Sequence, residues 1–277
     1  MSKAEGTFFT VERNGPVAEI TMNRPDTANA MSPDFWEDLP RIIEDLTAKG
    51  SVRAAILCGA GRHFSGGMDL STFNSIAAML KAEPGRAAHT LRRLILKLQH
   101  TFTALEHAPF PVIAAIHGAC IGGAIDMITA CDIRLASQDA FFAIEEINIG
   151  MAADVGTLQR LPKLIAPGIA AELALTGRRF DSAEARGIGL VTGTFPDRDT
   201  LMEEARLLAG ALAARSPLAI AGIKRNLAFS RDHSVADGLD YIATWNGGML
   251  RAEDLMEAIQ ARAQKRAAVF KDLGVPA

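Results

Sequence analysis

Hydrophobic and polar positions in the first fifth of the chain follow first the strand period and then the helix period. Residues 8–12 and 17–22 are short β-prone runs around Asn14-Gly15, a pair that tolerates positive φ and predicts a tight hairpin turn. Apolar residues then recur at helical spacing over residues 33–49 and predict an amphipathic helix. Pro40 lies inside this pattern, so we expect a kink or a broken first turn there.

Residues 54–58 predict a short apolar strand, and residues 112–116 predict a buried one. Between them, residues 71–89 lack clear periodicity and include Pro84-Gly85, so we expect a mobile loop or an insertion. An apolar stripe over residues 91–105 predicts a second amphipathic helix, which follows that loop.

Two more short strands are predicted at residues 133–136 and 141–144, and from residue 158 onward the pattern is almost entirely helical, with a last long helical segment over residues 254–269. Strands that alternate with helices and are followed by helices alone predict an α/β fold. We therefore expect an α/β core over residues 1–199 and a C-terminal helical region over residues 200–277.

Composition narrows the class of protein. The chain has 277 residues, and this length is sufficient to bury a sizeable core. Hydrophobic residues make up 49% of the chain and charged residues 22%, as in an ordinary globular protein. The net charge of −3 does not suggest a basic surface that would bind nucleic acid. No apolar run approaches the ~20 residues that a helix needs to span a bilayer. Because neither end shows a targeting pattern, the expected location is the cytoplasm. The three cysteines and six histidines show no metal-ligand spacing, so we expect no metal.

Three segments carry residues suited to chemistry. Residues 63–70 (His-Phe-Ser-Gly-Gly-Met-Asp-Leu) and 118–126 place paired glycines after strands, where backbone amides approach a ligand closely. Residues 141–156 embed acidic side chains in apolar sequence, where burial raises a carboxyl pKa toward neutral pH. Taken singly, these segments are equally compatible with an ordinary turn, a helix-start Asp126 and solvated strand-edge acids such as Glu145.

Taken together and in this order, the segments resemble the enoyl-CoA hydratase/isomerase, or crotonase, family. The correspondence begins at residues 20–25 and 29–31, continues through residues 64–70, 117–126, 130–134 and 159–162, and ends with residues 185–191 and 264–270. Each motif alone is weak, whereas the ordered set is specific. The resemblance implies a crotonase-type ββα spiral with two roughly perpendicular sheets and a C-terminal helical trimerisation region.

The family resemblance also implies an acyl-CoA thioester substrate and an oxyanion hole. By motif match, the main-chain N–H groups of Met68 and Gly123 are the donors that hold the thioester oxygen as enolate character develops. The residues expected to bind substrate are Gly66, Gly67, Met68, Asp69, Leu70 and Gly123. No separate cofactor is expected, because coenzyme A is part of the substrate. We expect a homotrimer or a dimer of trimers.

The expected catalytic residues are three acids. Family hydratases carry Glu where this chain has Asp126 and again at Glu146, and they usually have Gly where this chain has Asp154. The triple Asp126, Glu146 and Asp154 resembles Δ3,5-Δ2,4-dienoyl-CoA isomerases of fatty acid β-oxidation. Such a reaction removes a proton from C2 and delivers one to C6, so two separated acid/base groups suit it. Our hypothesis assigns Glu146 to C2 and Asp154 to C6, with the reverse order open, and gives Asp126 an orienting role.

Three alternatives stay open on the sequence. They are an enoyl-CoA hydratase, a Δ3-Δ2-enoyl-CoA isomerase and a non-catalytic crotonase-fold binding protein. The sequence leaves the acyl chain length and the role of residues 71–89 undefined.

Overall fold

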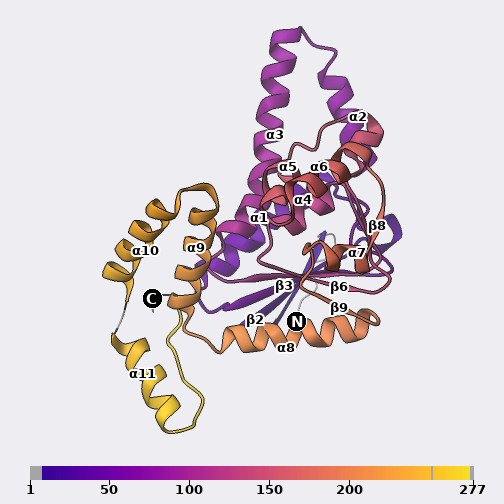
Figure 1. The fold of residues 1–277 in the computed structure, drawn as a ribbon. Coiled ribbons are helices and arrows are strands. Elements are labelled where there is room, and N and C mark those ends of the chain that lie inside the picture. The colour runs from indigo at the N-terminus through magenta and orange to yellow at the C-terminus, as the bar shows by residue number, and fades with distance from the viewer. Residues whose placement is uncertain (1–7, 251, 275–277) are drawn as a thin grey trace.

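The computed structural model describes residues 8–250 and 252–274 and contains two β-sheets (Figure 1). The larger sheet has the strand order β1 (Phe9–Asn14), β2 (Val17–Met22), β3 (Ala54–Gly59), β4 (Val112–Ile116), β6 (Ile133–Ser137) and β9 (Gly193–Phe195). The smaller sheet consists of β5 (Ala119–Ile121), β7 (Phe141–Ala143) and β8 (Phe180–Asp181). β1 and β2 form the predicted antiparallel hairpin, and the other pairs of the larger sheet are parallel.

Both faces of the larger sheet are covered. Along β3, Ala54, Ile56 and Cys58 pack against α8 (Arg198–Ala213), which runs along one face of the sheet in Figure 1. Ala55 and Leu57 belong to the larger core cluster on the opposite face. This burial explains why the strand reads as a continuous apolar run instead of an alternating one.

Helix α1 (Pro33–Ala48) runs through Pro40 without interruption, so the broken first turn does not occur. Pro40 has no N–H to donate to the carbonyl of Trp36 four residues earlier. The hydroxyl of Thr101, from the neighbouring helix, donates to that carbonyl at 3.1 Å instead. The tertiary contact therefore supplies the hydrogen bond that the proline removes.

The expected loop at residues 71–89 is wrong, because the segment is mostly helical. Figure 1 shows α2 (Leu70–Met79) and α3 (Pro84–His107) side by side as a helical hairpin that projects from the body of the protein. Pro84 lies in the first turn of α3, where its missing N–H costs nothing. The carboxylate of Glu83 caps the helix by accepting from the N–H groups of Gly85 and Arg86 at 2.9 and 3.1 Å. The Pro-Gly pair thus begins a helix here.

Smaller elements complete the second half of the core. They are α4 (Gly123–Thr129), the 3₁₀ turn η2 (Glu145–Ile149), α5 (Thr157–Arg160), η3 (Leu161–Lys163), α6 (Pro167–Thr176) and α7 (Ser182–Gly187), and η1 (Pro25–Thr27) lies near the N-terminus. Strands β8 and β9 interrupt the region that the pattern predicted as almost entirely helical. Glu145 and Glu146 begin a 3₁₀ turn and do not lie at a strand edge, which is the alternative that the sequence left open.

The chain ends in α9 (Pro217–Asp232), α10 (Val235–Met249) and α11 (Ala252–Ala263), which lie to one side of the sheets in Figure 1. α11 ends earlier than residue 269, where the predicted helix ended. The division between residues 199 and 200 falls inside α8 and stays a prediction. Among the described residues no single helix is long and apolar enough to cross a membrane, although α8 and α9, bent by 107°, pass that test as a pair.

Candidate active site

Two glycine-containing loops meet beside the smaller sheet. The N–H of Ser65 donates to the carbonyl of Ala119 at 2.9 Å, and the N–H of Ile121 donates to the carbonyl of Ser65 at 3.2 Å. A Cβ on Gly67, whose φ is +89°, would lie 2.7 Å from the carbonyl oxygen of Ile121. Only glycine permits this approach, and it brings the predicted oxyanion segments side by side.

The predicted donors, Met68 and Gly123, both have unengaged backbone N–H groups. Gly123 opens α4, and the first N–H groups of a helix have no partner within it. Across residues 8–250 and 252–274, neither of these two N–H groups donates a hydrogen bond. Met31 fixes the first loop, because its N–H donates to Gly67 and its carbonyl accepts from Asp69, at 2.8 and 3.2 Å. Both N–H groups are therefore free to donate to a ligand.

Asn29 organises the first of these loops, although the sequence analysis placed it only within a family motif. Its buried amide donates to the carbonyls of Ala60 and His63 at 2.9 and 2.8 Å. The main-chain carbonyl of Asn29 accepts from the hydroxyl of Ser65, and this hydroxyl accepts from the N–H of Gly67 at 3.2 Å. An asparagine at φ +52° is a common turn residue, so nothing local in the sequence identified this function.

Asp126 lies on α4 and is completely buried. Its Oδ1 accepts the N–H of Thr157 at 2.6 Å. Its Oδ2 is buried and has no partner among the described residues. Burial raises the pKa of this carboxyl, and the N–H of Thr157 opposes that rise. Thr157, which the sequence did not single out, therefore orients the acid through its backbone.

Glu146 lies in η2, next to the second glycine loop. Its Oε1 is 3.4 Å from the position that a Cβ on Gly122 would occupy, one residue before the proposed donor Gly123. Its Oε2 is buried and also has no partner among residues 8–250 and 252–274. Burial, and then the negative charge of Asp126, raise the pKa of Glu146 to about 7. A carboxyl with that pKa is suited to proton transfer near neutral pH.

Asp154 is half-buried, and burial raises the pKa of its carboxyl as well. Its negative charge contributes to the raised pKa values of both Asp126 and Glu146. Its backbone carbonyl accepts from the side chain of Gln99 on α3 at 2.7 Å. The structure thus brings the three sequence-predicted acids into one electrostatically coupled group, whose pKa values belong to the group as a whole.

The other expected site residues border the first loop. Gly66 is exposed, and a Cβ there would make only ordinary contact with Ala28. Asp69 pairs with Arg24 at 3.3 Å, and Leu70 begins α2. In the described part of the chain, no group of three or more His, Cys, Asp or Glu side chains could hold a metal ion.

Comparisons with known proteins show the family of this chain. The family model described as enoyl-CoA hydratase/isomerase matches residues 12–273. The chain is 46% identical over 259 residues to the Delta(3,5)-Delta(2,4)-dienoyl-CoA isomerase, peroxisomal, of Arabidopsis thaliana, covering 93% of each chain. It is 45% identical to the mitochondrial enzyme of that name from Rattus norvegicus, over 90% of this chain and 77% of the rat protein.

A solved structure extends the likeness to the fold. The enoyl-CoA hydratase from Bacillus anthracis superposes with a TM-score of 0.87 at 30% identity, covering 96% of this chain and 99% of the other. The chain belongs to the enoyl-CoA hydratase/isomerase family, and its fold is the crotonase fold.

These relatives correct the expected location. The Arabidopsis relative is named peroxisomal and the rat relative mitochondrial, which contradicts the cytoplasmic expectation. Location is set by short address segments that receptors read, and such segments leave no trace in the packing of the fold.

Proposed function

We propose that this protein is an isomerase that converts 3,5-dienoyl-CoA to 2,4-dienoyl-CoA. The observation that supports the proposal is a third carboxyl, Asp154, whose charge acts on the buried Asp126 and the partly buried Glu146, in a chain with two unengaged N–H groups at Met68 and Gly123. The names and identities of the Arabidopsis and rat relatives support the same substrate class. No cofactor is proposed beyond the coenzyme A of the substrate.

In the proposed mechanism, the N–H groups of Met68 and Gly123 hold the thioester oxygen. Glu146 removes a proton from C2, and the negative charge spreads from the oxygen along the conjugated carbons to C6. Fixed donors at the oxygen are worth ~3–4 kcal/mol each in such a site. Asp154 then delivers a proton to C6, which leaves double bonds at C2 and C4. Gly66, Gly67, Asp69 and Leu70 line the acyl-CoA path.

Asp126 has a different proposed role, because its Oδ1 is engaged by Thr157 and the residue is completely buried. A second carboxylate close to Glu146 disfavours ionisation of both groups. Asp126 therefore keeps Glu146 basic enough to accept a carbon-bound proton, and it can share the proton that Glu146 takes up.

The test is steady-state isomerisation of a 3,5-dienoyl-CoA, followed by the absorbance of the conjugated product. Asp154→Asn keeps the shape of the side chain and removes its acid, so we expect at least a 100-fold loss of kcat. Crotonyl-CoA hydration is measured on both proteins. Wild type that hydrates crotonyl-CoA rapidly and does not isomerise the diene would refute the proposal in favour of a hydratase, the activity named for the Bacillus anthracis structure.

Solvent-label exchange assigns the two acids. In D₂O, Asp154→Asn should retain exchange at C2 and lose delivery of label to C6. Loss of exchange at C2 with delivery to C6 retained would reverse the roles of Glu146 and Asp154.

We also propose a homotrimer or a dimer of trimers. Support comes from large apolar side chains exposed on α9 and α10, among them Ile223, Leu227, Val235 and Leu239. Clusters of this kind on a surface mark protein contacts. Sedimentation equilibrium distinguishes the two assemblies by mass, and a monomer at micromolar concentration would refute both.

A further inference from the structure

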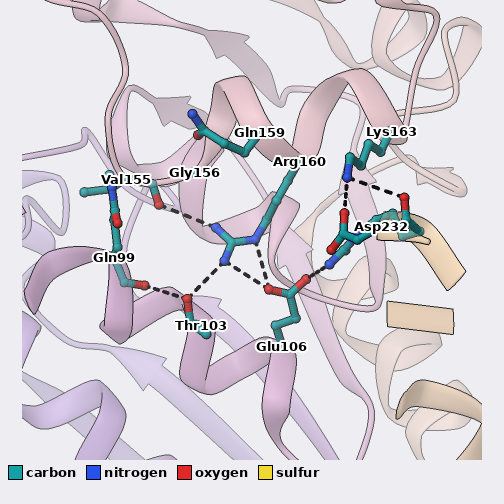
Figure 2. A pocket seen from close by; sticks show the side chains of 10 residues that line it. Gln99, Thr103, Glu106, Val155, Gly156, Gln159, Arg160, Lys163 and Asp232 are labelled. Atoms are coloured by element: carbon teal, nitrogen blue, oxygen red, sulfur yellow. Dashed lines mark hydrogen bonds and ion pairs between the residues drawn. The ribbon is translucent and has the colours of Figure 1, made fainter. Parts of the chain in front are cut away.

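A polar cavity of about 310 Å³ lies between α3 and the turn that carries Asp154 (Figure 2). Its lining includes Gln99, Thr103 and Glu106 from α3, and Val155, Gly156 and Arg160 from the turn and α5. Figure 2 shows the guanidinium of Arg160 at the centre of this arrangement. Arg160 belongs to the family motif at residues 159–162, and the sequence analysis assigns no role to its side chain.

All three guanidinium nitrogens of Arg160 are engaged. Nε and Nη2 donate to one carboxylate oxygen of Glu106 at 3.3 and 3.0 Å, and Nη2 also donates to the hydroxyl of Thr103 at 3.2 Å. Nη1 donates to the carbonyl of Val155 at 3.5 Å. The Arg160 and Glu106 side chains are only 12% and 13% exposed, so solvent screens this pair less than a surface ion pair.

The turn is built around this guanidinium. Gly156 has φ +140°, and a Cβ there would lie 2.0 Å from Nη1 of Arg160. The arginine therefore occupies the space that a side chain at position 156 would need. Displacing it would remove both a hydrogen bond and the packing partner of the turn.

The same turn holds parts of two catalytic acids. The turn begins at Asp154, and it ends at Thr157, whose N–H donates to Asp126 at 2.6 Å. Gln99 fixes the carbonyl of Asp154 from α3. A shift of the backbone between residues 154 and 157 would therefore move Asp154 and release Asp126 together, while Glu146 lies on a separate element.

Glu106 is held from the other side by Arg231 of α9, which donates to its second oxygen. Burial alone would raise the pKa of Glu106, but the guanidiniums of Arg160 and Arg231 bring it below its ordinary value. Glu106 thus stays ionised and anchors Arg160 to α3.

We infer that Arg160, anchored by Glu106, is a positioning residue that fixes the turn from Asp154 to Thr157 and so sets the geometry of proton delivery. The inference rests on the proposed isomerase function for its catalytic readout. Arg160 itself touches neither reacting carbon nor a catalytic carboxyl.

The test compares Arg160→Lys with wild type in the D₂O experiment. Lysine keeps the charge but cannot make the forked contacts to Glu106 and Val155. We expect delivery of label to C6 to fall about 100-fold, the cost of an approximately 1 Å misplacement. Exchange at C2 should fall much less, because Glu146 lies on a separate element and loses only the orientation of Asp126. Equal loss at C2 and C6 would mean a general structural role and would overturn the inference.

The matched control is Lys163→Gln. Lys163 lines the same cavity but donates to Asp232 and to the carbonyl of Arg231, and within the described residues it makes no hydrogen bond to residues 154–157, so its variant should behave as wild type. Glu106→Gln is the second variant, in case Arg160→Lys does not fold. It should reproduce the selective loss at C6 more weakly, because the amide oxygen still accepts from Arg160.

Hydrogen exchange of the peptide that spans residues 153–160 separates this inference from the proposed function. Faster exchange in Arg160→Lys, with Lys163→Gln unchanged, is expected even if wild type proves to be a hydratase. Unchanged exchange in Arg160→Lys would overturn the inference whatever reaction the enzyme catalyses. An inactive wild type in the isomerisation assay would refute the proposed function alone.

Discussion

Replacing Glu146 with glutamine should inactivate the enzyme and stabilise its fold at alkaline pH. Glutamine has nearly the same shape as glutamate and carries no charge. The acid is kept in a buried site beside Asp126, where its ionised form is disfavoured. The protein therefore gives up stability to keep a base of suitable pKa.

The magnitude follows from the raised pKa. Below pH 4.5 the carboxyl is protonated in both the folded and the unfolded chain, so it contributes no pH dependence. Between 4.5 and about 7 the folded protein holds a proton that the unfolded chain has lost, so stability falls as pH rises. At ~1.4 kcal/mol for each pH unit, the full cost above pH 7 is ~3 kcal/mol. Because Asp126 and Asp154 share the titration, we expect ~1–3 kcal/mol to be recovered in the variant.

The assay is urea denaturation of wild type and Glu146→Gln at pH 5 and pH 8.5, at one protein concentration because assembly contributes to stability. The variant should be the more stable at pH 8.5, and the gain should be small at pH 5. Glu203→Gln, at an exposed position of α8, controls for the change in net charge. Equal effects of Glu146→Gln at the two pH values, or destabilisation at pH 8.5, would refute the reasoning.

Three other substitutions test separate parts of the structure. Gly67→Ala places a methyl group 2.7 Å from a carbonyl oxygen, so kcat should fall by ~10²–10³ through loss of one oxyanion donor, while Gly168→Ala, where a Cβ meets nothing within 4 Å, should stay within a few-fold in the same assay. Lys224→Met leaves the carboxylate of Asp132 and two carbonyls without their buried partner and should cost ~3–5 kcal/mol in urea denaturation; unchanged stability would argue against a structural lysine. Thr101→Val orphans a carbonyl of α1 and should cost ~1–3 kcal/mol without changing kcat, a result that activity per folded molecule checks.

Much of the fold could be predicted because local patterns and tertiary packing agree. The hairpin around Asn14-Gly15 follows from turn chemistry, and the apolar runs of β3 and β4 follow from burial on both faces of a parallel sheet. The error at residues 71–89 has a different origin. Pro-Gly is compatible with a loop or with the first turn of a helix, and the capping carboxylate of Glu83 decides for the helix only in the folded chain.

In the candidate site, too, some residues could be predicted from the sequence and others could not. The glycines of the two loops and the three acids were identified from the ordered motifs, since close backbone approach and buried carboxyls restrict which residues can serve. Residues that act through position were not identified. Asn29 and Arg160 look ordinary in the sequence, and the partners Ala60 and Glu106 lie 31 and 54 residues away from them in the chain.

The sequence by itself determined the elements, the family pattern and the chemical groups at the site, because these depend on residue type and local spacing. Only the tertiary structure decided the strength of those groups as acids. Glu146 owes its raised pKa to burial and to the charges of Asp126 and Asp154, which come from other elements of the fold. It also decided that the buried Lys224 pairs with Asp132 and that Arg160 donates to the turn beside Asp154. Burial and charge proximity are properties of the packed chain, so no local pattern encodes them.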